Sequence, residues 1–327
     1  MQSILYDKWA QKLANKDLCL TDATCYECHL RYPTDVKSLW ESSAWLHTLL
    51  SKICKELGER KPRNKYADIN RARLAYAKQR KHTYKATQKL RRCLLNLLSK
   101  LICQWNRLCR QYTTSICLNA EQSKRIAAVN EVRRQLQDLM EKNVQHRIVS
   151  IDRPYLRPIV RGKENKCVEF GAKVNNIQID GIPFIEHHSF EAFNEGIRLK
   201  ECIDYQEKLT GIAVKRVGAD TIYANNANRK FCTDKGIVTC FARKGPKPKD
   251  EDVDLHTTRR IIGNLHATVM EGSYGNQKLY YGVERIAARN QFCETLLLFF
   301  GIHMANAATL AARELAKEEV LKKRKTA

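Results

Sequence analysis

A chain of 327 residues with 43% hydrophobic residues is long enough to bury one large core or two smaller ones, so we expect a globular protein. Its 58 lysines and arginines stand against 35 acidic residues, and the net charge of +23 favours a polyanionic partner, with nucleic acid ahead of an anionic membrane surface. The 13 cysteines are odd in number and irregularly spaced, which excludes a disulfide framework and indicates a reducing compartment such as the cytoplasm.

The sequence predicts no membrane partner. Its N-terminus has no apolar stretch of the kind that a signal peptide needs. The longest apolar run, Leu296 to Ile302, is too short to cross a bilayer.

The first predicted elements occupy residues 1–35. A short helix over residues 3–16 leads into an apolar run, Leu18-Cys19-Leu20, which is typical of a buried strand. Asp22 is expected where this strand ends.

Residues 36–148 are predicted to form an inserted helical hairpin or bundle. This region has almost no Gly or Pro, and its apolar residues recur at helical spacing. The pattern predicts one helix that ends near Gly58, a second through Leu90 to Trp105, and a third through Ile126 to Leu139.

Positive charge concentrates between Glu59 and Arg92, where thirteen lysines and arginines face two acids. One interpretation is a solvated helix face. Because the excess is large and tyrosines are interleaved with the charges, we favour contact with DNA phosphates, which gives affinity without sequence readout. The expected contacts are Lys78, Arg80, Lys81, Lys85 and Lys89.

Residues 149–318 are expected to complete an α/β domain. Alternating residues predict a hairpin with Asp180-Gly181 at its turn, followed by a helix that ends at Gly211. A strand before Asp220, a helix over 226–235, a short strand over 237–241 and two C-terminal helices, 257–280 and 286–318, follow. Residues 319–327 form a basic tail.

Three acids stand out as candidate metal ligands: Asp22, Asp220 and Glu271. Carboxylates at strand ends and on a helix can hold two divalent cations for in-line displacement at phosphate. Glu271, Tyr274 and Lys278 would share one helix face. Taken singly, Asp22 is better explained as a strand-terminal acid that caps a turn, and Asp220 as an exposed acid before a helix. The trio on the helix could be a surface salt-bridge stripe.

Several motifs occur in the order found in one known family. Thr21-Asp22-Ala23-Thr24 followed by Leu30-Arg31-Tyr32-Pro33-Thr34-Asp35 resembles the first-aspartate segment of DDE transposases from bacterial insertion sequences. The stretch from Arg157 to Lys173 and the motif Ala219-Asp220-Thr-Ile-Tyr223 resemble the surroundings of the second aspartate. Glu271 with Lys278 fits the family's glutamate and lysine signature, and the resemblance covers about residues 15 to 315.

The resemblance implies a ribonuclease-H-like fold, a mixed sheet flanked by helices with a long helical insertion after the first strand. It implies metal-dependent DNA cleavage and strand transfer, with two Mg²⁺ or Mn²⁺ ions held by Asp22, Asp220 and Glu271. Double-stranded DNA would be the partner, with no small-molecule substrate, in a bacterial cytoplasm associated with the nucleoid, and a homodimer is left open. Besides the five cations above, the expected DNA contacts are Arg157, Arg161, Lys163, Tyr274 and Lys278.

Two departures keep an alternative open. Ala267 and Asn264 stand where the family usually has Arg and Tyr. Only about twenty residues precede Asp22, where relatives carry an end-recognition domain. The alternative is therefore a truncated, catalytically inactive remnant that binds DNA without sequence preference.

Overall fold

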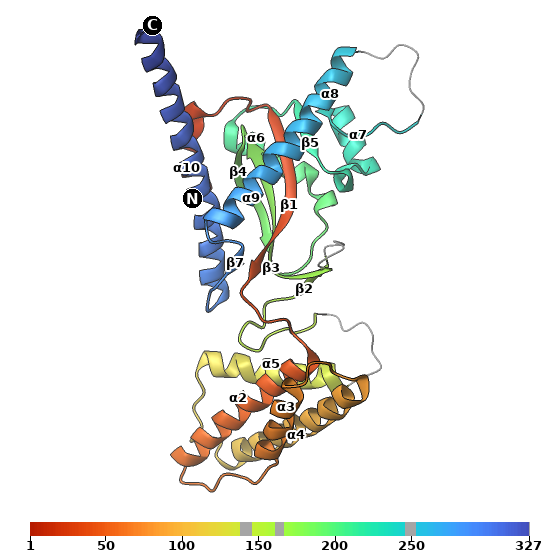
Figure 1. Cartoon of the computed structure of the whole chain (residues 1–327), viewed down its shortest axis with the longest axis vertical. Helices are drawn as coiled ribbons and strands as arrows, with labels where there is room; N and C mark the ends of the chain where they lie inside the picture. Colours follow the sequence, from red (N-terminus) through yellow and green to blue (C-terminus); the bar gives the residue numbers. More distant parts are fainter. Residues whose placement is uncertain (138–145, 161–166, 246–252, 327) are drawn as a thin grey trace. The chain divides into compact units, whose positions relative to one another are not determined.

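The computed structural model describes residues 1–137, 146–160, 167–245 and 253–326. The chain divides into two compact units, one made of Met1–His29 with Ile159–Ala327 and the other of Leu30–Pro158 (Figure 1). We call them the sheet unit and the helical unit. The helical unit covers nearly the same residues as the insertion expected over 36–148.

The sheet unit is mixed α/β. Its strands are β1 (Leu18–Cys28), β2 (Pro158–Val160), β3 (Val168–Ile179), β4 (Ile182–Ser189), β5 (Arg216–Ala219), β6 (Val238–Thr239) and β7 (Arg285–Ile286). The strand order is β2-β3-β1-β5-β6, with β4 paired to β3 and β7 paired to β1. β1 runs antiparallel to β3 and parallel to β5, so the sheet is mixed.

Helices cover both faces of this sheet (Figure 1). The helices are α1 (Gln2–Trp9), α6 (Leu199–Thr210), α7 (Asn226–Asp234), α8 (Val253–Leu265), α9 (Glu271–Tyr280) and α10 (Gln291–Thr326), with short turns η1 (Ala10–Lys12), η2 (Glu195–Ile197) and η3 (Thr221–Tyr223). A π-helical turn, η4 (His266–Met270), joins α8 to α9. α6 packs on one face of the sheet, where Cys202 and Ile203 belong to the same hydrophobic core as Cys19 and Ile177.

The helical unit contains α2 (Asp35–Glu56), α3 (Tyr66–Ala77), α4 (Tyr84–Gln111) and α5 (Ala120–Gln137). Leucines at helical spacing on α2 and α4 form its core, and each fully buried leucine contributes roughly 1.5–3 kcal/mol. Thr34 and Thr83 cap α2 and α4, since each side chain accepts a hydrogen bond of 3.2 Å from the backbone N–H three residues later.

Most predicted elements are present, but several differ, and α10 continues to Thr326 through the residues expected to form a basic tail. The β3–β4 hairpin turns at Asp180 and Gly181, whose φ angles of 50° and 79° suit the expected two-residue turn. However, β1 does not end at Asp22 but continues to Cys28. α3 was not predicted, because none of its residues is buried and its apolar pattern is weak. The strand before Asp220 is short, since β5 begins only at Arg216.

α10 is long and apolar enough, by length and composition, to span a membrane between Gln291 and Val320. Its contacts are those of a core helix. Ile302 and Leu310 are buried, and Asn306 donates a hydrogen bond of 2.7 Å to the carbonyl of Pro183 on β4. We therefore interpret α10 as a helix that packs against the sheet.

Candidate active site

Asp22 and Asp220 are neighbours on adjacent parallel strands. The register between β1 and β5 pairs Thr21 with Ala219. Asp22 is the next residue of β1, and Asp220 directly follows the end of β5, so the pairing brings their backbones side by side. Asp22 is half-buried and Asp220 is exposed, which leaves the second carboxylate open to solvent.

The alternation of side chains along β1 assigns Asp22 to one face of the sheet. Leu18 and Leu20 pack against Met270 on the face that α8 and α9 cover. Thr21 lies on the other face, where its Oγ1 is 3.2 Å from Cys202 Sγ of α6. Because every second residue of a strand shares a face, the Asp22 side chain lies on the side of α8 and α9.

The side chain of Asp220 lies on the same face of the sheet as that of Asp22. A Cβ on Gly218 would lie 3.0 Å from Ile262 Cγ2 of α8, so position 218 faces that helix. Asp220 is two residues farther along an extended backbone and shares that side. Its Oδ1 accepts a hydrogen bond of 2.6 Å from the Thr221 N–H, which caps η3 and fixes the carboxylate.

Several side chains tie the segment that carries Glu271 to β1, among them Gln277, which accepts a hydrogen bond from Tyr26. His266 Nε2 lies 3.2 Å from the Thr21 carbonyl oxygen. Tyr274 donates a hydrogen bond of 2.7 Å to the Asp22 carbonyl, and Lys278 Nζ donates one of 3.0 Å to Thr24 Oγ1. Glu271 is exposed and begins α9 directly after η4, and single π-helical turns occur frequently at functional sites.

The donor chemistry fits a hard divalent cation, because carboxylate oxygens are the ligands that Mg²⁺ prefers. The positions of the candidate ligands do not yet form a complete metal site. Within the described ranges, no three His, Cys, Asp or Glu side chains come together as a group that could hold an ion. The structure thus brings the backbones of Asp22 and Asp220 side by side and ties the helix that begins with Glu271 to β1, without gathering all three carboxylates around one point.

The negative charge of Asp22 helps to raise the pKa of two buried tyrosines, Tyr274 and Tyr223. Burial raises the pKa of Tyr274 well above its ordinary value, and the negative charge of Asp22 raises it further. Burial also raises the pKa of Tyr223, and the negative charge of Asp22 adds to this effect. Both phenols therefore remain protonated and act as hydrogen-bond donors, Tyr223 to Asn175 Oδ1 at 2.6 Å.

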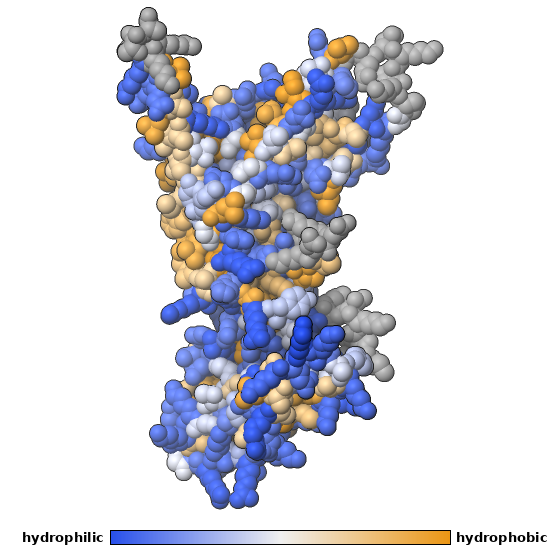
Figure 2. Space-filling view, in the orientation of Figure 1, coloured by the Kyte–Doolittle hydropathy of each residue, from blue (hydrophilic) through white to orange (hydrophobic). Residues whose placement is uncertain are grey.

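The basic residues expected to bind DNA are exposed around the turn that joins α3 to α4. Figure 2 shows hydrophilic side chains over much of the helical unit, whereas the sheet unit displays more apolar surface. The exposed cations of this turn and of the start of α4 are Lys78, Arg80, Lys81, Lys85 and Lys89.

The other expected DNA contacts differ in their surroundings. Tyr274 is 8% exposed and its hydroxyl is engaged by the Asp22 carbonyl, so we assign it a positioning role in place of the expected DNA contact. Arg157 is half-buried and donates a hydrogen bond of 2.9 Å to the Leu156 carbonyl. Arg161 and Lys163 lie outside the described residues.

Sequence reasoning missed His266 and Asn176. Asn176 is fully buried on β3 and lies directly opposite Asp22 in the antiparallel register. Asn176 had no distinguishing signal, because β3 carries several other polar residues, among them Lys173, Asn175 and Gln178. His266 had no signal, because its contact to Thr21 depends on how α8 crosses the sheet.

None of the protein-family models, curated proteins or solved structures compared with this chain matches it.

Proposed function

We propose that this chain is the catalytic core of a DDE-type DNA transposase with a ribonuclease-H-like sheet unit, acting on double-stranded DNA in the bacterial cytoplasm. The observation that carries the proposal is the register of β1 and β5, which makes Asp22 and Asp220 neighbours beneath the segment that bears Glu271. The ordered motifs around these residues support the same activity.

In this proposal Asp22, Asp220 and Glu271 would hold two Mg²⁺ ions. When bound, such a pair lowers the pKa of the attacking hydroxyl and stabilises the leaving oxygen. Water attacks phosphorus, the bond from phosphorus to the 3′ oxygen breaks, and the strand ends as a 3′-hydroxyl and a 5′-phosphate. That 3′-hydroxyl would then attack a phosphorus of the target strand, so that the new ester bond forms as the bond from that phosphorus to its own 3′ oxygen breaks and the target strand is left with a free 3′-hydroxyl.

The other residues of the site position these groups. Tyr274 holds the backbone of Asp22 against α9, and the ammonium group of Lys278 lies beside the same strand at Thr24. Lys278 is a suitable contact for a DNA phosphate near the cleaved bond, because its cation stands on the same helix face as Glu271. The exposed cations between α3 and α4 would bind DNA phosphates without reading the sequence.

The second candidate is a DNA-binding protein without catalytic activity. The observation in its favour is that the described residues do not gather three metal-ligating side chains. It predicts the same affinity for DNA and no metal-dependent cleavage.

Nicking of supercoiled plasmid in the presence of Mg²⁺ or Mn²⁺ separates the two candidates. The transposase proposal predicts nicking by the wild type and none by Asp22→Asn, which keeps the shape of the side chain and removes a ligand charge. Asp234→Asn removes an exposed acid at the end of α7 and is the matched control, expected to nick like the wild type. Equal nicking by Asp22→Asn and wild type would overturn the assignment of Asp22.

A further inference from the structure

One face of α4 carries a continuous row of basic residues. Residues three or four apart lie on the same face of an α-helix, and exposed residues follow one another at these spacings along the whole of α4. The basic members of this row are Lys85, Lys89, Arg92, Lys100, Arg107 and Arg110. Asn96 and Cys103 complete it, and we call these residues the α4 row.

The α4 row lies on the side of the helix opposite to the core. Leu94, Leu101 and Trp105 occupy the other side of α4 and are buried in the core of the helical unit. Because the core fixes the rotation of the helix about its axis, the row faces solvent along its whole length. At a rise of 1.5 Å per residue, the row is about 37 Å long.

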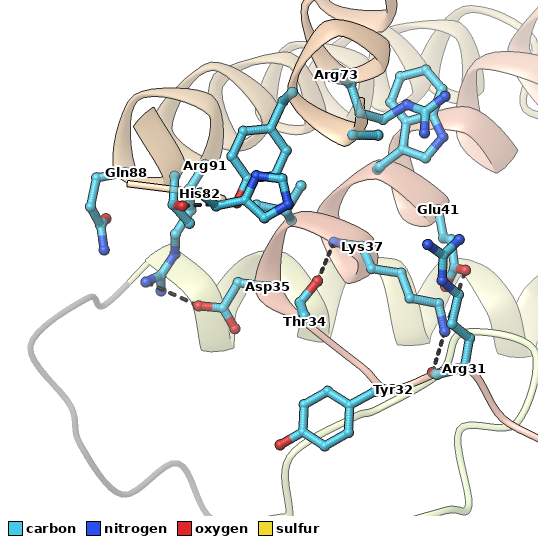
Figure 3. Close-up of a pocket in the computed structure, with 15 residues that line it drawn as sticks. Arg31, Tyr32, Thr34, Asp35, Lys37, Glu41, Arg73, His82, Gln88 and Arg91 are labelled. Carbon is cyan, nitrogen blue, oxygen red and sulfur yellow. Dashed lines mark hydrogen bonds and ion pairs between the residues drawn. The ribbon is translucent and has the colours of Figure 1, made fainter. Parts of the chain in front are cut away.

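The cations of the α4 row are not neutralised by acids. α4 contains no aspartate or glutamate, and in the part of the chain that the structure describes none of the six cations forms an ion pair. Cations elsewhere in this unit are paired. Arg91, on another side of α4, lies 3.0 Å from Asp35 (Figure 3), and Lys37 of α2 lies 3.7 Å from Glu41 one turn later.

This arrangement of charge is unfavourable for the helix by itself. Lys85 and Lys89 are four residues apart, and like charges at this spacing repel. Lys85 also lies in the first turn of α4, which has no acid and where the helix dipole disfavours a cation. A polyanion along the row would relieve both effects, whereas solvent alone would not.

The charge of the whole unit favours the same kind of partner. Residues 30–158 contain 28 lysines and arginines and 10 acids, so the helical unit carries +18 of the net charge of +23. A DNA duplex presents one negative charge for about every 1.7 Å of its axis, over any length. About eleven base pairs of duplex would therefore match the length of the α4 row.

We propose that a DNA duplex lies along the α4 row, which binds its phosphates over about eleven base pairs. The inference takes double-stranded DNA as the partner from the proposed function and adds the surface that holds it. It extends the contacts expected near the turn between α3 and α4 by four cations, Arg92, Lys100, Arg107 and Arg110. Phosphate contacts carry no sequence information, so this surface would accept any duplex.

Cys103 lies within the α4 row and reports directly on whether the row is covered. Its thiol is exposed, and the exposed Cys117, which follows the end of α4 and lies outside the row, is the internal control. The test is alkylation of the wild-type chain by N-ethylmaleimide in EDTA, followed by mass spectrometry of the peptides. With a duplex at about ten times its Kd, alkylation of Cys103 should slow on the order of tenfold, because the reagent reaches only the free protein. Alkylation of Cys117 should not change.

Neutral variants test the contribution of the row to affinity. The triple variant Lys100→Gln, Arg107→Gln and Arg110→Gln removes three cations from an exposed face and leaves the core of the unit untouched. Each lost phosphate contact should reduce the slope of log affinity against log salt by about 0.9, so the slope should fall by up to about 2.7. Fluorescence anisotropy at several salt concentrations, again in EDTA, measures the slope.

The matched control is the triple variant Lys52→Gln, Lys55→Gln and Lys124→Gln, which removes the same charge from exposed positions of α2 and α5. Its slope should stay close to that of the wild type. Equal slopes of the two triple variants, or protection of both thiols alike, would overturn the inference.

Three further outcomes separate the partner and the function. Unchanged alkylation of Cys103 in a chain that binds the duplex would overturn the inference and leave the proposed function standing. Protection of Cys103 by polyglutamate but not by the duplex would overturn it as well, because an acidic protein would then be the partner. The assay contains no metal, so a protected Cys103 in a chain that does not nick plasmid would uphold the inference and refute the proposed catalysis alone.

Discussion

Tyr274 of α9 donates a hydrogen bond of 2.7 Å to the backbone carbonyl of Asp22 in the middle of β1. The bond joins the helix that begins with Glu271 to the strand that bears the first candidate ligand. Since Lys278 makes a second bond four residues later, to Thr24, the helix cannot slide along the strand without breaking both. The relative position of Asp22 and Glu271 is therefore set by these contacts.

Tyr274→Phe should destabilise the protein while keeping the ring in place. The change leaves the Asp22 carbonyl without this donor in a buried setting, which costs about 1–3 kcal/mol in free energy of unfolding. Urea denaturation measures this difference. Tyr280→Phe, at a position 77% exposed on the same helix, should change stability by less than about 0.5 kcal/mol. Equal stability of both variants would show that the Tyr274 hydroxyl contributes nothing.

Arg198→Met should destabilise the sheet unit strongly. Arg198 Nε donates a hydrogen bond of 3.0 Å to Glu186 Oε2, and the Glu186 side chain is only 5% exposed. Removing the arginine leaves a buried carboxylate without its cation, which costs roughly 3–5 kcal/mol. The double variant Glu186→Gln with Arg198→Met removes the buried charge as well and should recover part of the loss in urea denaturation. No recovery would argue that packing of Arg198, and not its charge, is what matters.

Stability should fall between pH 6.5 and 4 because of His303. Burial lowers the pKa of His303 to about 4, so over this window the unfolded chain binds a proton that the folded chain does not. The free energy of unfolding is then highest above pH 6.5 and decreases by up to about 3 kcal/mol as the pH approaches 4.

The measurement is the midpoint of thermal unfolding across this range. His303→Gln removes the titrating group and should flatten the curve, whereas His256→Gln, at an exposed position of α8, should leave it as steep as in the wild type. A curve of the same slope in all three proteins would exclude His303 as the cause.

DNA affinity should fall steeply as the salt concentration rises, and it should depend on the lysines around the turn between α3 and α4. If six or more phosphates are contacted, affinity falls on the order of a thousandfold between 50 and 200 mM salt. Reversing the charges of Lys78, Lys81 and Lys85 should lower affinity for all sequences alike and reduce the salt slope. Competition binding at several salt concentrations measures both effects.

A second triple charge reversal controls for the change in net charge. It is made at Lys8, Lys200 and Lys215, which are exposed lysines of the sheet unit. This variant has the same net charge as the first and should keep most of the affinity. A thousandfold preference of the wild type for one particular DNA end over shuffled DNA would contradict binding through phosphates alone.

Local patterns predicted local structure well. The Asp180-Gly181 turn and the leucine stripes of α2 and α4 carry their signals within a few residues, and the structure contains the corresponding elements. α3 lacked such a signal, since no residue of Tyr66–Ala77 is buried. The continuation of β1 beyond Asp22 depends on pairing with β3, about 150 residues away in the chain, which no local pattern contains.

The candidate site was predictable only in part. Asp22 and Asp220 could be named because each follows an apolar run, and the β1–β5 register does make them neighbours. The role of Tyr274 differs from the expectation, because helical spacing shows which residues share a face but not whether that face meets solvent or a strand. The contact of His266 with Thr21 depends on tertiary packing and had no counterpart in the sequence.

The most direct test of the account is the binding of Mn²⁺ to the chain without DNA, followed by electron paramagnetic resonance of the free ion. We expect the wild type to bind Mn²⁺. Asp22→Asn and Asp220→Asn should each weaken this binding at least tenfold, because both carboxylates would hold the same ions. Asp234→Asn should bind like the wild type. Unchanged Mn²⁺ binding in either Asp22→Asn or Asp220→Asn would contradict the shared metal site on which the proposed function rests.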